Sequence, residues 1–353
     1  MPPRSPLPAL RAILKACTDT RATNPALAHV AVLPDGATGT VLRATDTDNA
    51  ASLYLPGPVA GALAGLAGPV GIPVGLVLDA LDGRSLPTGH PTLPAADLPP
   101  IPDAPATGWI EDGPLLPALG RVARFASSDN TRAGLNGIHC ETAGDTIRFA
   151  ATDGHRLHVE APGKGSLPGA LLPTAWCSLV ARLPWESVRI AVADGTCWAR
   201  GTLPAGIRAS IGGRVLDGDF PDWTQVVPAG VQREATFPAA ELLPVLADVV
   251  RLLRGGTPIV TLDIDPDAAV PSARFRAGNA DTGIVAHTLL WQGNGRALKI
   301  GFNARFLTDA IKAVTEGTGG ESVLLGMGDC LSPCLVIGSD PSRLSVVMPM
   351  RRD

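Results

Sequence analysis

Three segments of this chain share one helical pattern, and this internal repeat restricts most strongly how the chain can fold. The segments are LPALRAILK from Leu7, LPALGRVAR from Leu116 and LPVLADVVR from Leu243. Each has a proline at its second position, which the first turn of a helix tolerates, and apolar residues then recur at helical spacing. Each segment also ends on a cation at the same register: Lys15, Arg124 and Arg251. A chain with such a repeat is predicted to contain three copies of one structural unit.

A second marker follows each of these helices. It is a strand-like run that closes on an Asp-bearing turn, and it reads VLRATDTDN, IRFAATDGH and ARFRAGNAD in the three copies. The distance between successive turns matches the distance between successive helices closely. Chance similarity among leucine-rich helices would not preserve both spacings, so the repeat is interpreted as structural.

Each unit also contains a second predicted helix and alternating, strand-like stretches. The helices are expected at Val74 to Leu81, Thr174 to Leu183 and Asn303 to Val314, and two of the strands at 187–195 and 259–267. The pattern predicts an α+β fold of three similar units, near 1–105, 106–228 and 229–353. The first unit is the shortest, by enough residues for roughly three strands.

Composition excludes several classes of protein. Hydrophobic residues make up 45% of the chain and charged residues 18%, so a folded core is expected. The six cysteines form no CxxC pair, which argues against zinc and is typical of reduced thiols in a cytoplasmic protein. Residues 55–78 carry no charge, but their prolines and glycines disfavour a membrane-spanning helix. We expect no membrane segment and no cofactor.

Catalytic motifs are weak in this sequence. His155 and His158 lie beside Asp153, but strand alternation would place the two imidazoles on opposite faces. The Gly317–Gly320 run lacks the lysine of a phosphate-binding loop, and there is no GxSxG elbow. The prediction is a protein with no catalytic residue and no metal ligand, and a hydrolase that uses His155 and Asp153 is the alternative.

Five motifs in order resemble a known family. They are ATDGHRL at 151–157, Leu135-Asn136-Gly137, GDFPDWTQV at 218–226, IGFN at 300–303 and VVMPMR at 346–351. Together they resemble the bacterial replicative sliding clamp, the beta subunit of DNA polymerase III. The resemblance implies three similar clamp domains, each with two helices and antiparallel sheets. It also implies a head-to-tail homodimer that closes a ring around duplex DNA without sequence preference, and a cytoplasmic location.

In this family, partners insert a short hydrophobic peptide into a cleft between the second and third domains. The partners implied are the DNA polymerase III alpha subunit, the clamp loader and other clamp-motif proteins. The residues that the resemblance assigns to this cleft are Leu135, Thr152, Gly154, His155, Arg156, Leu157, Pro221, Val226, Asn303, Phe306, Leu331, Val346, Met348, Pro349 and Met350. The Met-Pro-Met run would offer an adaptable apolar surface.

Seven cations are candidates for contact with DNA phosphates. Lys15, Arg124 and Arg251 recur at one register of the first helices, and Arg121 and Arg254 lie within a turn of that register. Cations near a helix C-terminus also complement its dipole, and both interpretations can hold together. Arg21 and Arg132 lie in loops through which the family contacts DNA.

A variant of this hypothesis is a divergent clamp paralogue that binds clamp-motif partners without closing a ring. In the family, the last strand of the first domain pairs with the partner subunit. Here that strand would fall within LPTGHPT at 86–92, whose prolines and glycine disfavour a paired edge.

Overall fold

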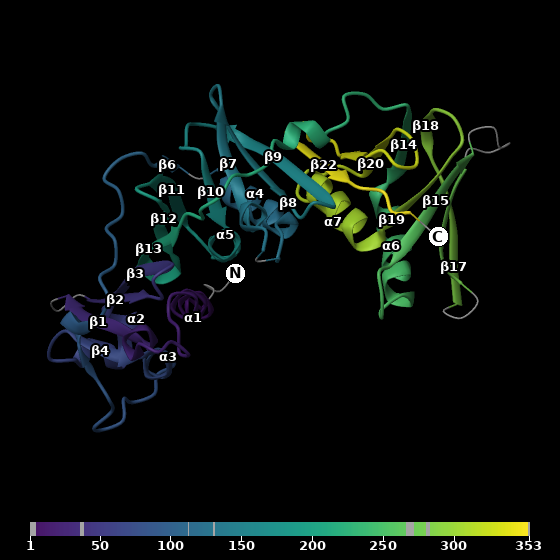
Figure 1. Ribbon diagram of the computed structural model, residues 1–353. Coiled ribbons are helices and arrows are strands. Elements are labelled where there is room, and N and C mark those ends of the chain that lie inside the picture. The colour runs from purple at the N-terminus through teal and green to yellow at the C-terminus, as the bar shows by residue number, and fades with distance from the viewer. Residues whose placement is uncertain are drawn as a thin grey trace. The chain divides into compact units, whose positions relative to one another are not determined.

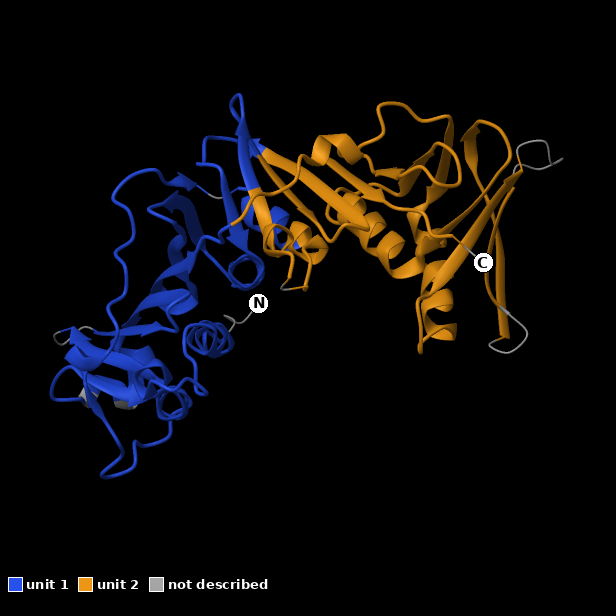
Figure 2. Ribbon diagram, viewed as in Figure 1, with its two compact units in different colours: residues 1–120, 140–147, 163–217 blue, residues 121–139, 148–162, 218–353 orange. Residues whose placement is uncertain are grey.

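The structure is a computed structural model, and it describes residues 5–35, 39–111, 113–129, 131–265, 272–279 and 283–351. Two compact units are distinguished in Figure 2. Unit 1 comprises residues 1–120, 140–147 and 163–217, and unit 2 comprises residues 121–139, 148–162 and 218–353.

Unit 1 is organised around one antiparallel sheet that can be followed in Figure 1. Its strands are, in spatial order, β5 (Leu93–Pro94), β4 (Val70–Pro73), β1 (His29–Asp35), β2 (Gly39–Thr45), β3 (Asn49–Pro56), β13 (Ile207–Arg214), β12 (Thr196–Leu203), β11 (Ser187–Ala193) and β6 (Ile110–Glu111). The pairing of β3 with β13, with Ser52 opposite Ser210, joins strands of the first and second predicted domains into a single sheet.

Helices cover one face of this sheet. They are α1 (Leu7–Ala16), α2 (Gly57–Ala60), α3 (Val74–Leu81) and α5 (Thr174–Val180). Helix α1 contacts α3, α5 and β3, while α5 contacts β13. Leu10, Ile13 and Leu14 are fully buried on the inner side of α1, because the helical spacing of these residues places them on one face. Trp176 of α5 is also buried, and its indole Nε1–H donates to the Ile211 carbonyl over 3.2 Å.

Unit 2 contains an antiparallel sheet and a smaller four-stranded sheet. The first includes, in spatial order, β9 (Arg156–Lys164), β22 (Arg343–Val347), β21 (Cys334–Ile337), β20 (Ser322–Met327), β14 (Arg233–Pro238) and β18 (Gln292–Asn294). Beyond β9, the same sheet continues through β8 (Thr146–Thr152), β7 (Gly137–Ala143) and β10 (Ala170–Pro173). The second has the order β17 (Gly283–Leu290), β16 (Ser272–Asn279), β15 (Ile259–Asp265) and β19 (Leu298–Asn303). Strand β9 pairs with β22, with Leu157 opposite Val346, so this sheet also joins two of the predicted domains.

Two helices of unit 2 pack side by side in Figure 1: α6 (Ala239–Leu252) and α7 (Ala304–Thr315). Helix α7 packs on β22 and β21, and α6 packs on β17 and β14. Helix α4 (Leu115–Val122) and the strands β7 and β8 run through the boundary between the units, and β10 precedes α5. The 3-10 helices are η1 (Pro25–Ala28), η2 (Gly61–Gly65), η3 (Ala95–Asp97), η4 (Ala123–Phe125), η5 (Ala133–Leu135), η6 (Pro204–Gly206) and η7 (Trp223–Val226).

The predicted helices are found with small differences at their ends. The helix expected at Val74 to Leu81 is α3 with the same bounds. Helix α5 ends at Val180, before the expected Leu183, and α7 begins at Ala304. Asn303 caps α7 instead, because its Oδ1 accepts the Arg305 backbone N–H over 3.0 Å. The α+β fold with antiparallel sheets is therefore confirmed.

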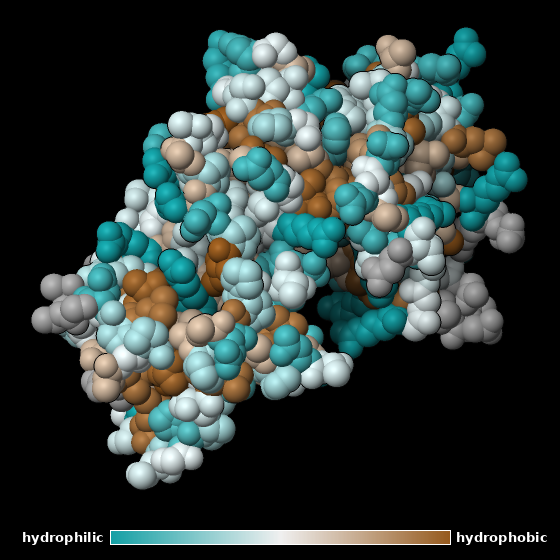
Figure 3. Space-filling model, turned by 60° about the vertical axis from the view of Figure 1, so that its left-hand side comes forward, coloured by the Kyte–Doolittle hydropathy of each residue, from teal (hydrophilic) through white to brown (hydrophobic). Residues whose placement is uncertain are grey.

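The uncharged stretch from Leu55 to Leu78 is divided among the end of β3, α2, η2, β4 and the start of α3. Within the described residues, no helix is both long enough and apolar enough to span a membrane. On the face drawn in Figure 3, hydrophobic residues gather in separate patches among hydrophilic ones. Residues 86–92 contain no strand, and the edge strand that follows them, β5, has two residues.

Candidate functional site

The turn between β8 and β9 is held by its own side chains. The Asp153 carboxylate accepts the backbone N–H of His155 over 2.9 Å and that of Arg156 over 3.1 Å. The Thr152 hydroxyl donates to the Arg156 carbonyl over 2.7 Å and accepts the Gly154 N–H over 3.0 Å. Gly154 has a φ of 87°, which a residue with a side chain rarely adopts. The sequence ATDGHRL therefore encodes a rigid turn.

Arg156 connects this turn to helix α7. Its Nε donates to Asp153 over 3.0 Å, one terminal nitrogen bonds Asp309 of α7, and the other donates to the Arg124 carbonyl over 2.8 Å. The guanidinium carbon also lies 4.6 Å from the Phe306 ring centre. The side chain is 11% exposed. Because these contacts fix the guanidinium, Arg156 holds the β8–β9 turn in place against helix α7.

An apolar cleft opens beside this turn, entirely within unit 2. Its volume is about 150 Å³. Its floor is a cluster of buried residues from paired strands, in which Leu157 and Val159 of β9 pack with Val346 of β22. The lining residues are Leu135, Thr152, Gly154, Arg156, Leu157, Pro221, Asp222, Trp223, Val226, Val346 and Met348. Nine of the residues predicted for a peptide cleft are therefore brought together here.

Sequence reasoning missed Asp222 and Trp223 as lining residues. Asp222 caps η7, and its carboxylate accepts the Thr224 backbone N–H over 3.0 Å. The Thr224 hydroxyl and N–H, together with Gln225, hold the pKa of Asp222 below its usual range, so the cleft has an anionic rim. Trp223 packs partly buried against the cleft floor. Both lie within the GDFPDWTQV motif, so the motif as a whole could have identified them.

The loop that carries these residues approaches the backbone at Gly134 very closely. A Cβ atom at position 134 would lie 2.3 Å from the Asp219 carbonyl oxygen, so a larger residue would displace the loop. Leu135 follows on η5 and reaches the cleft lining. Glycine at position 134 therefore allows two wall segments of the cleft to pack together.

Six residues predicted for the cleft lie outside its lining. The His155 ring is stacked with Phe306 at 6.2 Å between centres, and Asn303 is buried as the cap of α7. Leu331 is 53% exposed on the loop after β20. Pro349 and Met350 follow β22, and the Met350 N–H donates to the Gly301 carbonyl over 2.8 Å. These six residues surround the candidate site without forming its walls.

The residues that the alternative hydrolase would use have structural contacts. The Asp153 carboxylate is occupied by the turn and by Arg156. His158 is fully buried, where its Nδ1 lies 2.8 Å from the Ser345 hydroxyl, while His155 is exposed. Within the described part of the chain, no group of three or more His, Cys, Asp or Glu side chains could hold a metal ion.

Most of the candidate DNA-contacting cations are exposed. Lys15, Arg21 and Arg254 have exposed side chains, and Arg132 is exposed at 55% with Asp129 3.9 Å away. Arg124 is 42% exposed and pairs with Glu316 over 2.9 Å. Arg251 is 70% exposed and pairs with Asp248 over 2.8 Å.

The structure contradicts the prediction that Arg121 contacts DNA. Its side chain is 7% exposed and donates from Nε to Glu160 over 3.0 Å, so it cannot reach a phosphate. Two cations that sequence reasoning missed, Arg305 and Lys312 of α7, are exposed instead. They line a groove with Arg251 and Arg254, in which four cations face one carboxylate, that of Asp309. Positions 305 and 312 lie two turns apart on one helix face, a spacing visible in the sequence.

Comparison with known proteins agrees with this architecture. The family model for the central domain of the DNA polymerase III beta subunit matches residues 111–222, and that for its C-terminal domain matches residues 224–351. The beta sliding clamp of Caulobacter vibrioides is 28% identical over 277 residues, which cover 74% of this chain and 70% of that protein. The Streptomyces coelicolor beta sliding clamp is 25% identical over 275 residues, with 74% and 71% covered.

Solved structures extend the fold similarity to nearly the whole chain. The Bacillus subtilis DNA polymerase sliding clamp has a TM-score of 0.83 at 18% identity, with 98% of each chain covered. The Thermotoga maritima DNA polymerase III beta subunit has a TM-score of 0.80 at 20% identity, with 98% of this chain and 97% of that chain covered. The fold is thus that of a three-domain, ring-forming DNA clamp, including the residues before position 111.

Fold and cleft together define a non-catalytic clamp protein. The chain belongs to the family of the bacterial DNA polymerase III beta subunit, the beta sliding clamp. Its function in DNA replication is that of a processivity factor, and the protein is not an enzyme. The hydrolase alternative is therefore excluded.

Proposed function

We propose that this clamp encircles duplex DNA and tethers partner proteins through the apolar cleft beside the β8–β9 turn. The observation that carries the proposal is the gathering of Leu157, Val346 and Met348, with Trp223 and Val226, around one open cavity. The partners proposed are the DNA polymerase III alpha subunit, the clamp loader and other clamp-motif proteins. The proposed location is the cytoplasm, where a bacterial replication factor would meet DNA.

The chemistry of the cleft suits a short hydrophobic peptide. Its walls are mostly apolar, and Met348 offers a flexible, polarisable surface that adapts to different side chains. The Asp222 carboxylate at the rim and the Thr152 and Gly154 turn supply the few polar groups that orient a bound chain. Crystal structures of the Pseudomonas aeruginosa and Bartonella birtlesii sliding clamps were determined with griselimycin bound, so clamps with this fold accept a ligand other than DNA.

The decisive experiment measures the affinity of a fluorescein-labelled peptide that carries the clamp-binding motif of a polymerase III alpha subunit. Met348→Asp should weaken binding at least tenfold, because the peptide would have to bury an unpaired carboxylate. The matched control is Ala240→Asp, which introduces the same charge at an exposed residue in the first turn of α6, outside the cleft. Equal peptide affinity of the two variants would remove the cleft assignment.

For DNA, the proposal assigns phosphate contacts to exposed cations on the helices and neighbouring loops. These are Lys15, Arg21, Arg124, Arg132, Arg251, Arg254, Arg305 and Lys312. Arg124 and Arg251 retain carboxylate partners at the surface, so their contacts would be exchangeable. Weak, exchangeable phosphate contacts suit a protein that slides, because contacts with base edges would hold it at one sequence.

We propose domain bounds near 1–105, 106–228 and 229–353, and a homodimeric ring closed between the first and third domains. A candidate closing strand in the third domain is β17, where Ile284 is 52% exposed and Leu290 64% exposed. Within the described residues, β17 is an edge strand of its sheet, so its outer backbone groups are available to another chain.

One observation favours a second candidate, a clamp paralogue that binds partners without closing a ring. The edge strand of the first domain, β5, has two residues and includes Pro94, which cannot donate a backbone hydrogen bond. Light scattering over a dilution series separates the two candidates. A mass of twice 36.2 kDa that persists on dilution supports the ring, whereas 36.2 kDa at every concentration supports the paralogue.

A further inference from the structure

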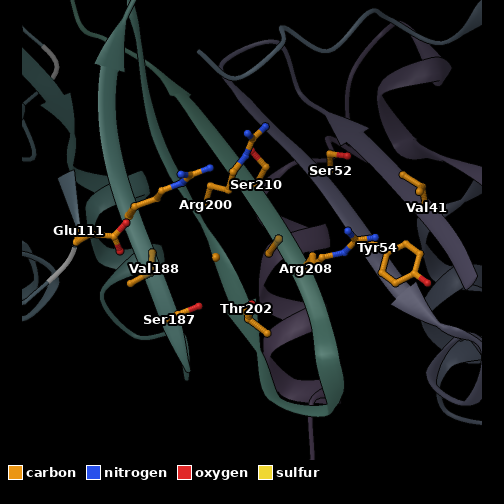
Figure 4. A pocket seen from close by; sticks show the side chains of 13 residues that line it. Val41, Ser52, Tyr54, Glu111, Ser187, Val188, Arg200, Thr202, Arg208 and Ser210 are labelled. Atoms are coloured by element: carbon orange, nitrogen blue, oxygen red, sulfur yellow. The ribbon is translucent and has the colours of Figure 1, made fainter. Parts of the chain in front are cut away.

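The outward-facing side of the unit 1 sheet carries a hollow that the clamp function does not explain. It has a volume of about 610 Å³ and lies across β11, β12, β13 and β3 (Figure 4). The opposite face of these strands buries Ile190, Ala209 and Ile211, and α1 and α5 pack on that side. The hollow therefore faces away from the helices that carry the candidate DNA contacts of unit 1.

Strand register brings polar side chains of this face into cross-strand rows. One row contains Glu111, Arg189, Arg200, Ser210 and Ser52, each directly opposite the next. The neighbouring row contains Ser187, Thr202, Arg208 and Tyr54 in the same way. Figure 4 shows Arg200, Arg208 and the hydroxyl-bearing side chains on this one surface.

Charge in this hollow is strongly unbalanced. Three arginines, Arg189, Arg200 and Arg208, line it with one carboxylate, Glu111. Among the residues that the structure describes, none of these guanidinium groups forms an ion pair. Arg189 and Arg200 are directly opposite each other, an arrangement in which like charges repel. A chain with a net charge of −4 thus concentrates positive charge at one place on its sheet.

Two aromatic rings hold the arginines in place. The guanidinium carbons of Arg189 and Arg200 lie 4.8 and 5.2 Å from the Trp109 ring centre. That of Arg208 lies 4.1 Å from the ring centre of Tyr54. A guanidinium that lies over a ring directs its N–H donors outward in its own plane, where they remain able to bind an anion. The rings are covered by arginine, so they do not form a platform for bases.

The chemistry of this surface fits phosphate groups better than a peptide. Arginine binds phosphate oxygens with paired N–H donors, and serine and threonine hydroxyls add further donors. Four serine and threonine residues line the hollow together with Tyr54: Ser52, Ser187, Thr202 and Ser210. An acidic peptide would need apolar anchors beside its carboxylates, and of the apolar side chains that line the hollow, Val188 and Ala209 are buried and Val41 is half-buried.

We propose that this arginine strip, defined as Arg189, Arg200 and Arg208, binds the phosphate backbone of a single-stranded nucleic acid outside the ring. Neighbouring strands are about 4.8 Å apart, so the strip spans roughly 10 Å across three strands. That length is sufficient for the strip to contact successive phosphates of one strand. A single strand is narrow enough to lie in the hollow. The site would hold a strand next to a clamp whose hole contains the duplex.

The test uses the full chain and a fluorescein-labelled 20-nucleotide oligothymidylate, with binding followed by anisotropy from 50 to 200 mM salt. Arg189→Gln, Arg200→Gln and Arg208→Gln are combined in one variant, because glutamine keeps polarity while removing charge. We expect binding to weaken at least tenfold at low salt. Removing three phosphate contacts should lower the slope of log K against log salt by about 2, at about 0.7 per contact.

Two matched controls locate the effect. Arg251→Gln, Arg305→Gln and Lys312→Gln remove the same charge from the α6–α7 groove, and their loss of oligothymidylate affinity should be smaller than that of the strip variant. Arg214→Gln, combined with Arg182→Gln and Arg148→Gln, removes three charges from outside the hollow and should leave binding unchanged. Circular dichroism melting of each variant establishes that it is folded.

Three outcomes would overturn the proposal. Wild-type oligothymidylate affinity in the folded strip variant would show that the strand binds elsewhere. An equal loss in both control variants would reduce the effect to net charge. A ten-residue polyglutamate peptide that displaces oligothymidylate and binds the strip more tightly would assign the surface to an acidic protein segment.

Discussion

Arg121 donates from Nε to the carboxylate of Glu160 over 3.0 Å, and both side chains are shielded from solvent, at 7% and 2% exposure. The same carboxylate lies 3.2 Å from Nε of Arg343 on β22 and 3.5 Å from Nε2 of His158. Helix α4 and strand β9 of the central domain are thus linked to β22 of the C-terminal domain by one buried charge network. The network lies in the sheet that also forms the floor of the cleft.

Loss of one member of this network should destabilise unit 2. Arg121→Met removes the doubly hydrogen-bonded partner of a buried carboxylate, a change that costs about 3–5 kcal/mol. The remaining cations near Glu160 favour the lower end of that range. The measurement is urea unfolding followed by tryptophan fluorescence. Arg84→Met, which breaks an exposed pair with Asp79, should cost about 1 kcal/mol or less. Similar small losses in both variants would contradict the role of the network.

The network also predicts how stability depends on pH. Burial lowers the pKa of His158 below its ordinary value, and the neighbouring Glu160 carboxylate only partly opposes this effect. Below about pH 6.5 the unfolded chain takes up a proton that the folded chain resists, so stability should fall as the pH decreases from 7.5 to 5.5. His158→Gln removes this titration and should flatten the curve of urea midpoint against pH. An unchanged slope in that variant would show that other groups cause the dependence.

Glu160 contributes at lower pH. Burial would raise its pKa, but the His158 imidazole 3.5 Å away and the hydrogen bonds from Arg121 outweigh burial and hold the pKa at about 2. A carboxyl group whose pKa is depressed on folding stabilises the protein above the unfolded pKa, near 4.5. That stabilisation is lost as the pH falls from about 4.5 towards 2. Acid unfolding of Glu160→Gln should therefore be less steep in this interval than that of the wild type, and an equally steep transition would argue against the assignment.

The sequence predicted the repeat better than it predicted individual contacts. The cation shared by all three first helices, at Lys15, Arg124 and Arg251, is exposed in every copy. Arg121 lies off that register, where the other copies have Ala12 and Asp248. Its burial depends on Glu160, 39 residues further along the chain. A helical cation has the same local pattern whether it faces water or a buried partner, so the local pattern alone could not separate Arg121 from the exposed cations.

The cleft could be predicted where its walls are local in sequence. The turn at 152–154 and the strand that follows it form one wall, and they coincide with a motif. Asn303, Leu331 and Met350 were predicted to line the cleft but lie outside its lining. Their positions depend on the paths of segments far apart in the sequence, which no local pattern specifies. Asn303 shows the difficulty, because the same residue type caps a helix equally well.

Arg156 should be sensitive to a conservative change. Lysine cannot reproduce the separate contacts of the guanidinium with Asp153, Asp309 and the Arg124 carbonyl, nor its stacking on Phe306. Arg156→Lys should weaken binding of the clamp-motif peptide by about tenfold, since a loss of about 1.4 kcal/mol in positioning the cleft gives that factor. Arg132→Lys, at an exposed arginine outside the lining, is the control and should retain wild-type affinity.

Substitutions at Trp223 and Leu331 should affect peptide affinity differently, and the difference tests where the cleft ends. Trp223 lines the cavity and packs on its floor, so Trp223→Ala should weaken peptide binding by about tenfold or more, as expected for a large aromatic residue at the centre of a contact surface. Leu331 is 53% exposed and outside the lining, so Leu331→Ala should leave the affinity within about twofold. Isothermal titration with one peptide compares both variants. A large loss for Leu331→Ala would mean that the loop after β20 closes over the bound peptide.

The groove between α6 and α7 predicts which cations hold duplex DNA. Arg251, Arg305 and Lys312 present their charges from two packed helices, with Asp309 partly neutralised by Arg156. Replacing all three with serine should weaken binding to a labelled 20-base-pair duplex and should lower its salt slope by about 2.7, at about 0.9 per phosphate contact. Arg189→Ser, Arg200→Ser and Arg208→Ser together remove equal charge from the arginine strip and should leave the duplex slope unchanged. If both triple variants lose the same slope, duplex binding follows net charge, and the groove has no special role.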